Sequence, residues 1–100
     1  MIRVSIKPNG FEAKGHAEFA ERGKDTVCAA ISGIIQTCAL GLMDRTDNKA
    51  KVQRGDGMFR VTLLDGLTNQ IKHDCDIIIG TMRLGLQDMQ RQYPKHIKVN

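Results

Sequence analysis

Residues 25–43 read DTVCAAISGIIQTCALGLM, and this stretch predicts the first of two long helices. Asp25 or Thr26 is a suitable N-cap, because a short polar side chain can accept hydrogen bonds from the first backbone N–H groups of a helix. Apolar residues then recur every three or four positions, the spacing that puts them on one helix face. The members of this stripe are Val27, Ile31, Ile34, Ile35, Cys38 and Leu42.

A second helix is predicted from Thr68 or Asn69 to the pair Tyr93-Pro94, where proline ends it. Gly80 and Gly85 lie inside it and cost roughly 1 kcal/mol each relative to alanine, so we interpret them as positions of close packing. Its apolar stripe consists of Ile71, Cys75, Ile78, Ile79, Met82, Leu86 and Met89.

The remaining segments predict one sheet. Pro8-Asn9-Gly10 and Gly55-Asp56-Gly57 are turn sequences, and the second of them is a hairpin signal. Two helices with one apolar stripe each need a sheet to cover. The sequence therefore predicts an α/β (α+β) fold, a two-layer sandwich in which one mixed sheet of about five strands is covered by two long helices. In the predicted order ββαββαβ the strands are residues 2–6, 11–17, 49–54, 58–64 and 96–99.

Composition restricts the class of protein. With 100 residues, 41% of them hydrophobic and 26% charged, the chain is expected to form a single globular domain, residues 1–100. We find no apolar run near the ~20 residues of a membrane span, and the start lacks the basic-then-apolar order of a secretory signal. We therefore expect a cytoplasmic protein that does not bind a membrane. An odd number of widely spaced cysteines predicts thiols rather than disulfides.

The net charge of +4 is mildly basic, and aromatic residues make up only 4% of the chain. So few aromatic side chains argue against a platform that stacks single-stranded nucleic acid. We interpret the basic residues as a solvated surface and do not expect direct nucleic-acid binding.

Cys28 and His16 are the candidate catalytic pair. Cys28 falls in the first turn of the predicted helix, where unpaired N–H groups and the helix dipole favour a thiolate. His16 lies near the end of the preceding strand, and the loop between them can bring both side chains together. The imidazole would take the thiol proton and later protonate a leaving amine, while free N–H groups of the first turn would hold an oxyanion. The alternative is that Cys28 is simply a small buried apolar residue.

Two neighbours of Cys28 have open roles. Asp25 is expected either to cap the helix or to orient His16. Ser32 lies one turn beyond Cys28 on the same helix face, where it either hydrogen-bonds near the thiol or only packs.

The other polar residues suggest no metal or cofactor. His73 and Cys75 project about 200° apart on a helix, so they do not face one ion. His96 is expected at the surface. The Gly-Asp-Gly sequence at 55–57 is interpreted as a turn, since no helix follows it to make a phosphate loop.

Four motifs, in this order and spacing, resemble the ribosomal-processing cysteine protease (Prp) family over essentially the whole chain. They are GHA at 15–17, GKD at 23–25, VCAAIS at 27–32 and YPKHIKV at 93–99. The resemblance implies a cytoplasmic endopeptidase, without a cofactor, that removes the N-terminal extension of the twenty-seventh large-subunit ribosomal protein.

The resemblance also assigns residues. It implies that Cys28 is the nucleophile, that His16 is the base, and that Gly15, Asp25 and Ser32 support them. It further implies a homodimer and a mobile loop, about residues 17–25, that gates access.

Other functions stay open at this point. The segment KAKVQRGDGMF, residues 49–59, is more polar than the family leads us to expect, which leaves the substrate open. The alternatives are a related protease acting on a phage structural protein, a non-catalytic ribosome- or RNA-associated module, and a cysteine enzyme acting on a small molecule.

Overall fold

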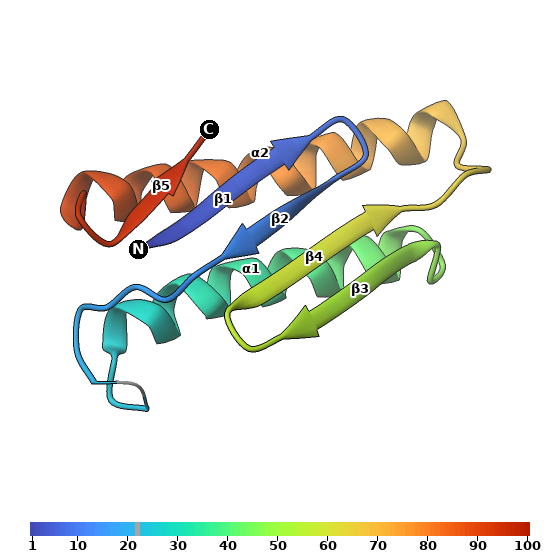
Figure 1. The fold of residues 1–100 in the computed structure, drawn as a ribbon. Coiled ribbons are helices and arrows are strands. Elements are labelled where there is room, and N and C mark those ends of the chain that lie inside the picture. Colours follow the sequence, from blue (N-terminus) through green and yellow to red (C-terminus); the bar gives the residue numbers. More distant parts are fainter. Residues whose placement is uncertain (22) are drawn as a thin grey trace.

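The computed structural model describes residues 1–21 and 23–100, and these form five strands and two helices in the predicted order ββαββαβ (Figure 1). The predicted fold class is confirmed. The elements are β1 (Ile2–Lys7), β2 (Gly10–Lys14), α1 (Thr26–Arg45), β3 (Ala50–Gly55), β4 (Met58–Leu63), α2 (Asn69–Gln92) and β5 (Ile97–Val99).

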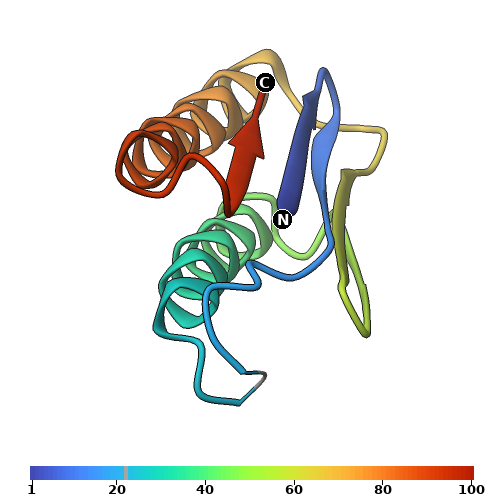
Figure 2. The same cartoon turned by 60° about the vertical axis from the view of Figure 1, so that its left-hand side comes forward.

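The described strands form one mixed sheet in the order β3-β4-β2-β1-β5. β5 runs parallel to β1, and the other neighbouring strands are antiparallel. Figure 2 shows both helices on the same face of this sheet. The last strand therefore lies beside the first, and the β3–β4 hairpin forms the opposite edge.

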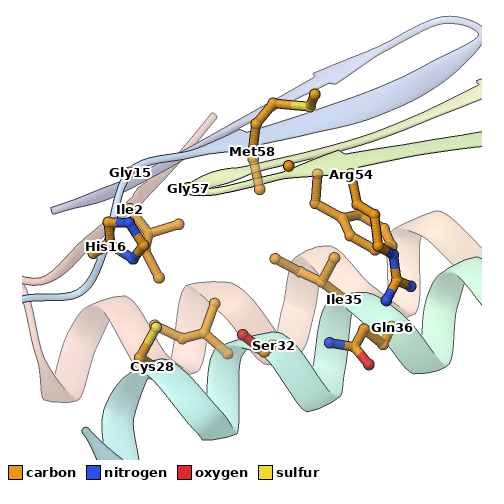
Figure 3. Close-up of a pocket in the computed structure, with 14 residues that line it drawn as sticks. Ile2, Gly15, His16, Cys28, Ser32, Ile35, Gln36, Arg54, Gly57 and Met58 are labelled. Carbon is orange, nitrogen blue, oxygen red and sulfur yellow. The ribbon is translucent and has the colours of Figure 1, made fainter. Parts of the chain in front are cut away.

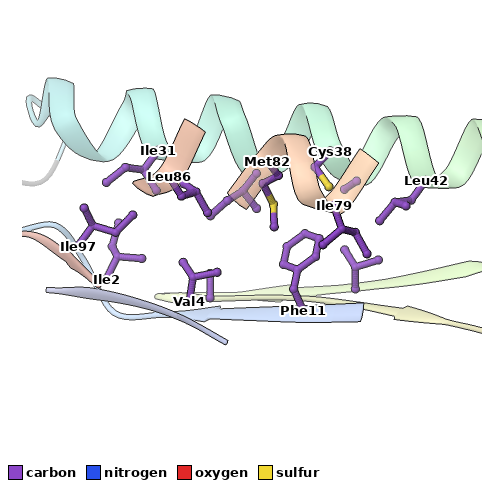
Figure 4. Packing of buried hydrophobic residues seen from close by; sticks show 14 of the residues in the cluster. Ile2, Val4, Phe11, Ile31, Cys38, Leu42, Ile79, Met82, Leu86 and Ile97 are labelled. Carbon is purple, nitrogen blue, oxygen red and sulfur yellow. The ribbon is translucent and has the colours of Figure 1, made fainter. Parts of the chain in front are cut away.

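The core lies between the sheet and the helices, and Figure 4 shows its side chains meeting from both layers. The α1 stripe was predicted correctly at Val27, Ile31, Ile35, Cys38 and Leu42, all of which are buried. Ile34 is only partly buried, because it lies at the groove between the helices. The buried residues of α2 are Cys75, Ile79, Met82 and Leu86, and the other members of its predicted stripe, Ile71, Ile78 and Met89, are partly buried.

Contrary to our expectation from composition, α1 is long and apolar enough to cross a membrane, with a mean hydropathy of 1.7 over an 18-residue window. In this fold 33% of that window is buried. The core helix of a soluble protein passes the same test, and the stripe that packs on the sheet explains much of the apolar character.

β2 is shorter than predicted. It ends at Lys14, so His16 lies in the following loop and not on a strand. Gly15 changes the direction of the chain with φ +98°, and a Cβ there would lie 2.3 Å from the carbonyl oxygen of Met1. Only glycine allows this close approach, which explains the glycine directly before His16 in the GHA motif.

Asp25 caps α1, as the first of its two interpretations predicted. Its Oδ1 accepts from the Cys28 N–H at 2.9 Å, and its Oδ2 accepts from the N–H groups of Phe19 and Ala20 at 2.9 and 3.2 Å. The carboxylate therefore joins the preceding loop to the start of the helix.

The two glycines of α2 differ. A Cβ at Gly85 would lie 3.6 Å from Ile34 Cγ2, so this glycine does face α1, whereas a Cβ at Gly80 would meet nothing within 4 Å. The close-packing interpretation is therefore confirmed for Gly85 and wrong for Gly80.

We predict that Gly80→Ala raises the free energy of unfolding by about 0.5–1 kcal/mol, because alanine orders the helix backbone more easily and nothing obstructs its methyl group. Urea denaturation followed by circular dichroism measures the change. Gly10→Ala is the opposing control, since its Cβ would lie 1.9 Å from the Val61 carbonyl oxygen and must destabilise the sheet. A destabilised Gly80→Ala protein would contradict the prediction.

We predict that Asp25→Asn loses stability at neutral pH and that this loss shrinks below about pH 4. Desolvation alone would raise the pKa of the Asp25 carboxyl, but hydrogen bonds from four backbone N–H groups outweigh it and hold the pKa below the ordinary 3.8. A depressed folded-state pKa stabilises the native state above the unfolded-state value, and the contribution disappears as pH falls through the folded-state value. Urea midpoints of both proteins at pH 7 and pH 3 test this, and a pH-independent difference would contradict it.

Candidate active site

Three elements meet at one end of the sheet: the chain leaving β2, the first turn of α1 and the turn of the β3–β4 hairpin (Figure 1). His16 comes from the first, Cys28 from the second and Gly57 from the third. All three line one cavity of about 290 Å³, shown in Figure 3. The fold thus brings together the two residues that the sequence predicted as a catalytic pair.

A second cavity, of about 700 Å³, adjoins the first. His16, Cys28 and Ser32 line both, so these side chains stand between two depressions. The first extends beneath the hairpin to Arg54 and Phe59. The second extends over the loop and is lined by the acidic residues Glu18, Glu21 and Asp25. This arrangement leaves room for a ligand on either side of the Cys28–His16 pair.

Every site residue predicted from the sequence lies here. Gly15 and Ser32 line the first cavity and Asp25 the second. Ser32 is half-buried, and its hydroxyl oxygen is directed toward the cavity in Figure 3. The His16 side chain is 34% exposed, and its Nε2 lies 3.5 Å from Asp56 Oδ1. Asp56 belongs to the turn at 55–57, whose part in the site the sequence analysis missed.

The three cysteines, all free, differ in their surroundings. Cys28 is partly exposed at the cavity, whereas Cys38 and Cys75 are buried. Burial, with a smaller contribution from Cys75, raises the pKa of the Cys38 thiol to about 12. Burial, followed by the charges of Asp76 and Asp74, also raises the pKa of Cys75. The two buried thiols therefore stay protonated at neutral pH and are poor nucleophiles.

Two N–H groups at the start of α1, those of Cys28 and Ala29, are not free to hold an oxyanion as we expected. The Cys28 N–H donates to the Asp25 carboxylate, and the Ala29 N–H donates to the Asp25 carbonyl at 3.1 Å. That expectation is wrong for these two groups, because the N-cap already uses them. The Ser32 hydroxyl, one helical turn further, is a donor that lines both cavities.

The loop that carries His16 is held by the C-terminal segment. Ala17 is fully buried, and its carbonyl accepts a hydrogen bond from His96 Nδ1 at 2.8 Å. The Phe19 ring makes edge contacts with Tyr93 and His96, at centroid distances of 5.6 and 5.4 Å. His96 is therefore half-buried and structural, which corrects our expectation of a surface residue.

Over residues 1–21 and 23–100 the structure contains no group of three or more His, Cys, Asp or Glu side chains that could hold a metal ion. His73 is exposed while Cys75 is completely buried, so this pair does not share a site, as its helical spacing predicted.

Comparison with known proteins places this site in a family. Residues 1–98 match the family model described as cysteine protease Prp. The ribosomal processing cysteine protease Prp of Mycoplasma genitalium is 35% identical over 104 residues, covering 100% of this chain and 95% of that protein. The protein of the same name from Bacillus subtilis is 25% identical over 107 residues, covering 99% of this chain and 96% of its own.

Solved structures agree on the fold. The essential ribosomal processing protease Prp from S. aureus, in complex with a covalently linked product peptide, superposes with a TM-score of 0.79 at 22% identity. That match covers 99% of this chain and 95% of the other. SMU.848 from Streptococcus mutans superposes with a TM-score of 0.75 at 24% identity, covering 100% of this chain and 92% of the other. The chain belongs to the Prp family of cysteine proteases.

Proposed function

We propose that this protein is a cytoplasmic endopeptidase that removes the N-terminal extension of the twenty-seventh large-subunit ribosomal protein, with Cys28 as nucleophile and His16 as base. The observation that carries the proposal is the joint position of these two side chains between two adjoining cavities. A peptide bond held at Cys28 has substrate on both sides, and the cavities give space to both.

The proposed reaction has two halves. His16 takes the proton from the Cys28 thiol, and the thiolate attacks the scissile carbonyl carbon to form a tetrahedral intermediate. The C–N bond then breaks as the imidazolium returns its proton to the leaving amine, and a thioester remains on Cys28. Water, deprotonated by His16, attacks the thioester, and the new carboxyl product leaves while the thiol is regenerated.

Three other residues support this pair. We assign the Ser32 hydroxyl as a donor to the developing oxyanion, since the first-turn amides of Cys28 and Ala29 are occupied. Gly15 allows the turn that leads to His16, and Asp25 fixes the start of the helix that carries Cys28.

The names of the relatives support a ribosomal protein as the substrate. The proteins from Mycoplasma genitalium and Bacillus subtilis are ribosomal processing proteases, and the S. aureus protease has been captured with a substrate peptide. Two cavities on either side of Cys28 also suit an extended peptide, which needs space on both sides of the bond that is cleaved.

We also propose a homodimer, which the family resemblance implies. The outer face of the two helices carries a groove of about 750 Å³ lined by small and apolar residues. Ile77, which lines it, is 56% exposed, and Leu40 and Leu84 on the same helices are each 67% exposed. A second copy would cover this surface, because a two-fold pair places one apolar patch against itself.

We predict that the protein cleaves a synthetic peptide spanning the extension and first mature residues of the ribosomal protein, and that Cys28→Ala and His16→Ala each lower kcat/KM by at least about 100-fold. Mass spectrometry of the products measures cleavage. Cys38→Ala is the matched control, since this thiol is buried and lines neither cavity of the site.

Two results separate the alternatives. If the wild-type protein leaves the peptide intact while Cys28 alkylates rapidly, the nucleophile stands and the substrate is wrong, as for a protease of phage proteins or a small-molecule enzyme. If it neither cleaves nor alkylates, the catalytic proposal is wrong and a binding module takes its place.

For the dimer, we predict that Ile77→Glu converts a wild-type dimer to a monomer in sedimentation velocity, because a charge would be buried in the apolar interface. Leu64→Glu is the matched control: Leu64 is 45% exposed but lies just after β4, away from this groove. A wild-type monomer, or equal effects of both substitutions, would contradict the prediction.

A further inference from the structure

We propose that the β3–β4 turn, Gly55–Gly57, forms part of the catalytic machinery and that Asp56 is a positioning residue for His16. The proposal rests on the proposed role of His16 as the base and adds the group that orients its ring. Three observations support it: the register between β2 and β4, the ion pair between His16 and Asp56, and the packing of the His16 ring on Gly57.

The register of the sheet brings the turn to His16. In the antiparallel β2–β4 pair, Lys14 lies opposite Met58. One residue further, beyond the end of β2, the Gly15 N–H still donates to the Gly57 carbonyl at 2.8 Å. Continuing the same register by one more residue places His16 opposite Asp56. Neither residue is on a strand, but the last rungs of the β2–β4 pair bring the loop and the turn together, so the two side chains can interact as directly opposed residues of a sheet do.

The ion pair follows from this register. His16 Nε2 lies 3.5 Å from Asp56 Oδ1, a distance that is long for a hydrogen bond and within the range of an ion pair. It turns Nε2 toward the hairpin. His16 and Cys28 line the same cavity (Figure 3), so with Nε2 held at the hairpin, Nδ1 is the ring nitrogen available to the thiol proton. In a histidine that acts as a base, one ring nitrogen accepts the proton and the other is held by a group that orients the ring.

Gly57 provides the surface on which the ring lies. A Cβ at this position would be 3.0 Å from His16 Nε2, a tight contact to which the ring must yield by a few tenths of an ångström. The backbone also has φ +66°, a conformation that glycine adopts without strain. A side chain here would push the ring away from the turn and change its distance from Cys28.

Other charged groups face the pair, and their positions matter for any pH effect. Asp25 at the start of α1 and Glu18 and Glu21 from the loop line the second cavity, with His16 and Cys28. Arg54 of β3 lines the first cavity, and its guanidinium lies 5.2 Å from the centre of the Phe59 ring. Of these groups, Asp56 is the acid within ion-pair distance of the imidazole.

The first test compares wild type with Asp56→Asn. Two quantities are measured against pH, the rate of Cys28 alkylation by iodoacetamide and kcat/KM for the peptide. We expect Asp56→Asn to lower kcat/KM by about two- to five-fold at low salt, the range of an exposed ion pair. The rate of Cys28 alkylation should fall together with kcat/KM, because both depend on how the imidazole is held beside the thiol.

Salt and two further variants sharpen this test. The difference from wild type should vanish near ~1 M salt, where charges are screened beyond ~3 Å, and Asp56→Glu should restore part of the loss. Asp65→Asn is the matched control, since it removes one exposed acidic charge from the loop after β4. It should leave both profiles in place.

The second test concerns Gly57. Gly57→Ala and Gly66→Ala both put alanine at a positive φ, +66° and +90°, so both should lose stability to a similar extent. Only Gly57→Ala should slow Cys28 alkylation and cleavage by at least about ten-fold, because only its methyl group displaces the base. The nearest atom to a Cβ at Gly66 is the end of the Lys49 side chain, at 3.8 Å.

The proposal is overturned if the Asp56→Asn profiles coincide with wild type at low salt, if any loss is independent of salt, or if Gly57→Ala behaves like Gly66→Ala. Failure of the proposed function is seen separately, as absence of peptide cleavage by wild type. The alkylation profiles then still decide whether Asp56 and Gly57 position His16 beside Cys28.

Discussion

The rotation of α1 about its own axis is the constraint on which the active site depends. Val27 and Ile31 are almost completely buried against the sheet, and this fixes which side of the helix faces the core. Successive residues on a helix are about 100° apart, so Cys28 and Ser32 must follow their apolar neighbours to the margin of the core. A rotation that brought Cys28 to the place of Val27 would bury the thiol. Burial of the apolar side chains thus fixes the direction in which the Cys28 thiol points, toward the cavity.

The N-cap couples this helix to the loop before it. Asp25 accepts hydrogen bonds from Cys28 on one side and from Phe19 and Ala20 on the other. One carboxylate therefore satisfies the end of the helix and shapes the segment between base and nucleophile. The same contacts occupy the Cys28 amide, which is why our proposal gives the oxyanion to a side chain, that of Ser32.

The local sequence pattern predicted most of the fold and the position of Cys28, but not the surroundings of His16. Helix stripes, caps and turns gave the element order and the position of Cys28 in a first helical turn, because these features depend on neighbours within a few residues. The pattern placed His16 on a strand, since nothing local reveals that Gly15 must avoid the carbonyl of Met1. Asp56 was interpreted only as a turn residue, because its position opposite His16 depends on the register between β2 and β4. The structural role of His96 was missed for the same reason: its partner, Ala17, is 79 residues away in the chain.

The contact between the C-terminal segment and the His16 loop has a consequence for how the enzyme matures on the ribosome. Cys28 and His16 are synthesised early, within the first third of the chain, and the β3–β4 hairpin follows them. The residues that hold the loop, Tyr93 and His96, come close to the end, next to the strand that completes the sheet beside β1. In a growing chain the loop that carries His16 therefore gains these contacts only after residue 96 has been added, so the geometry between His16 and Cys28 depends on the last segment to be made.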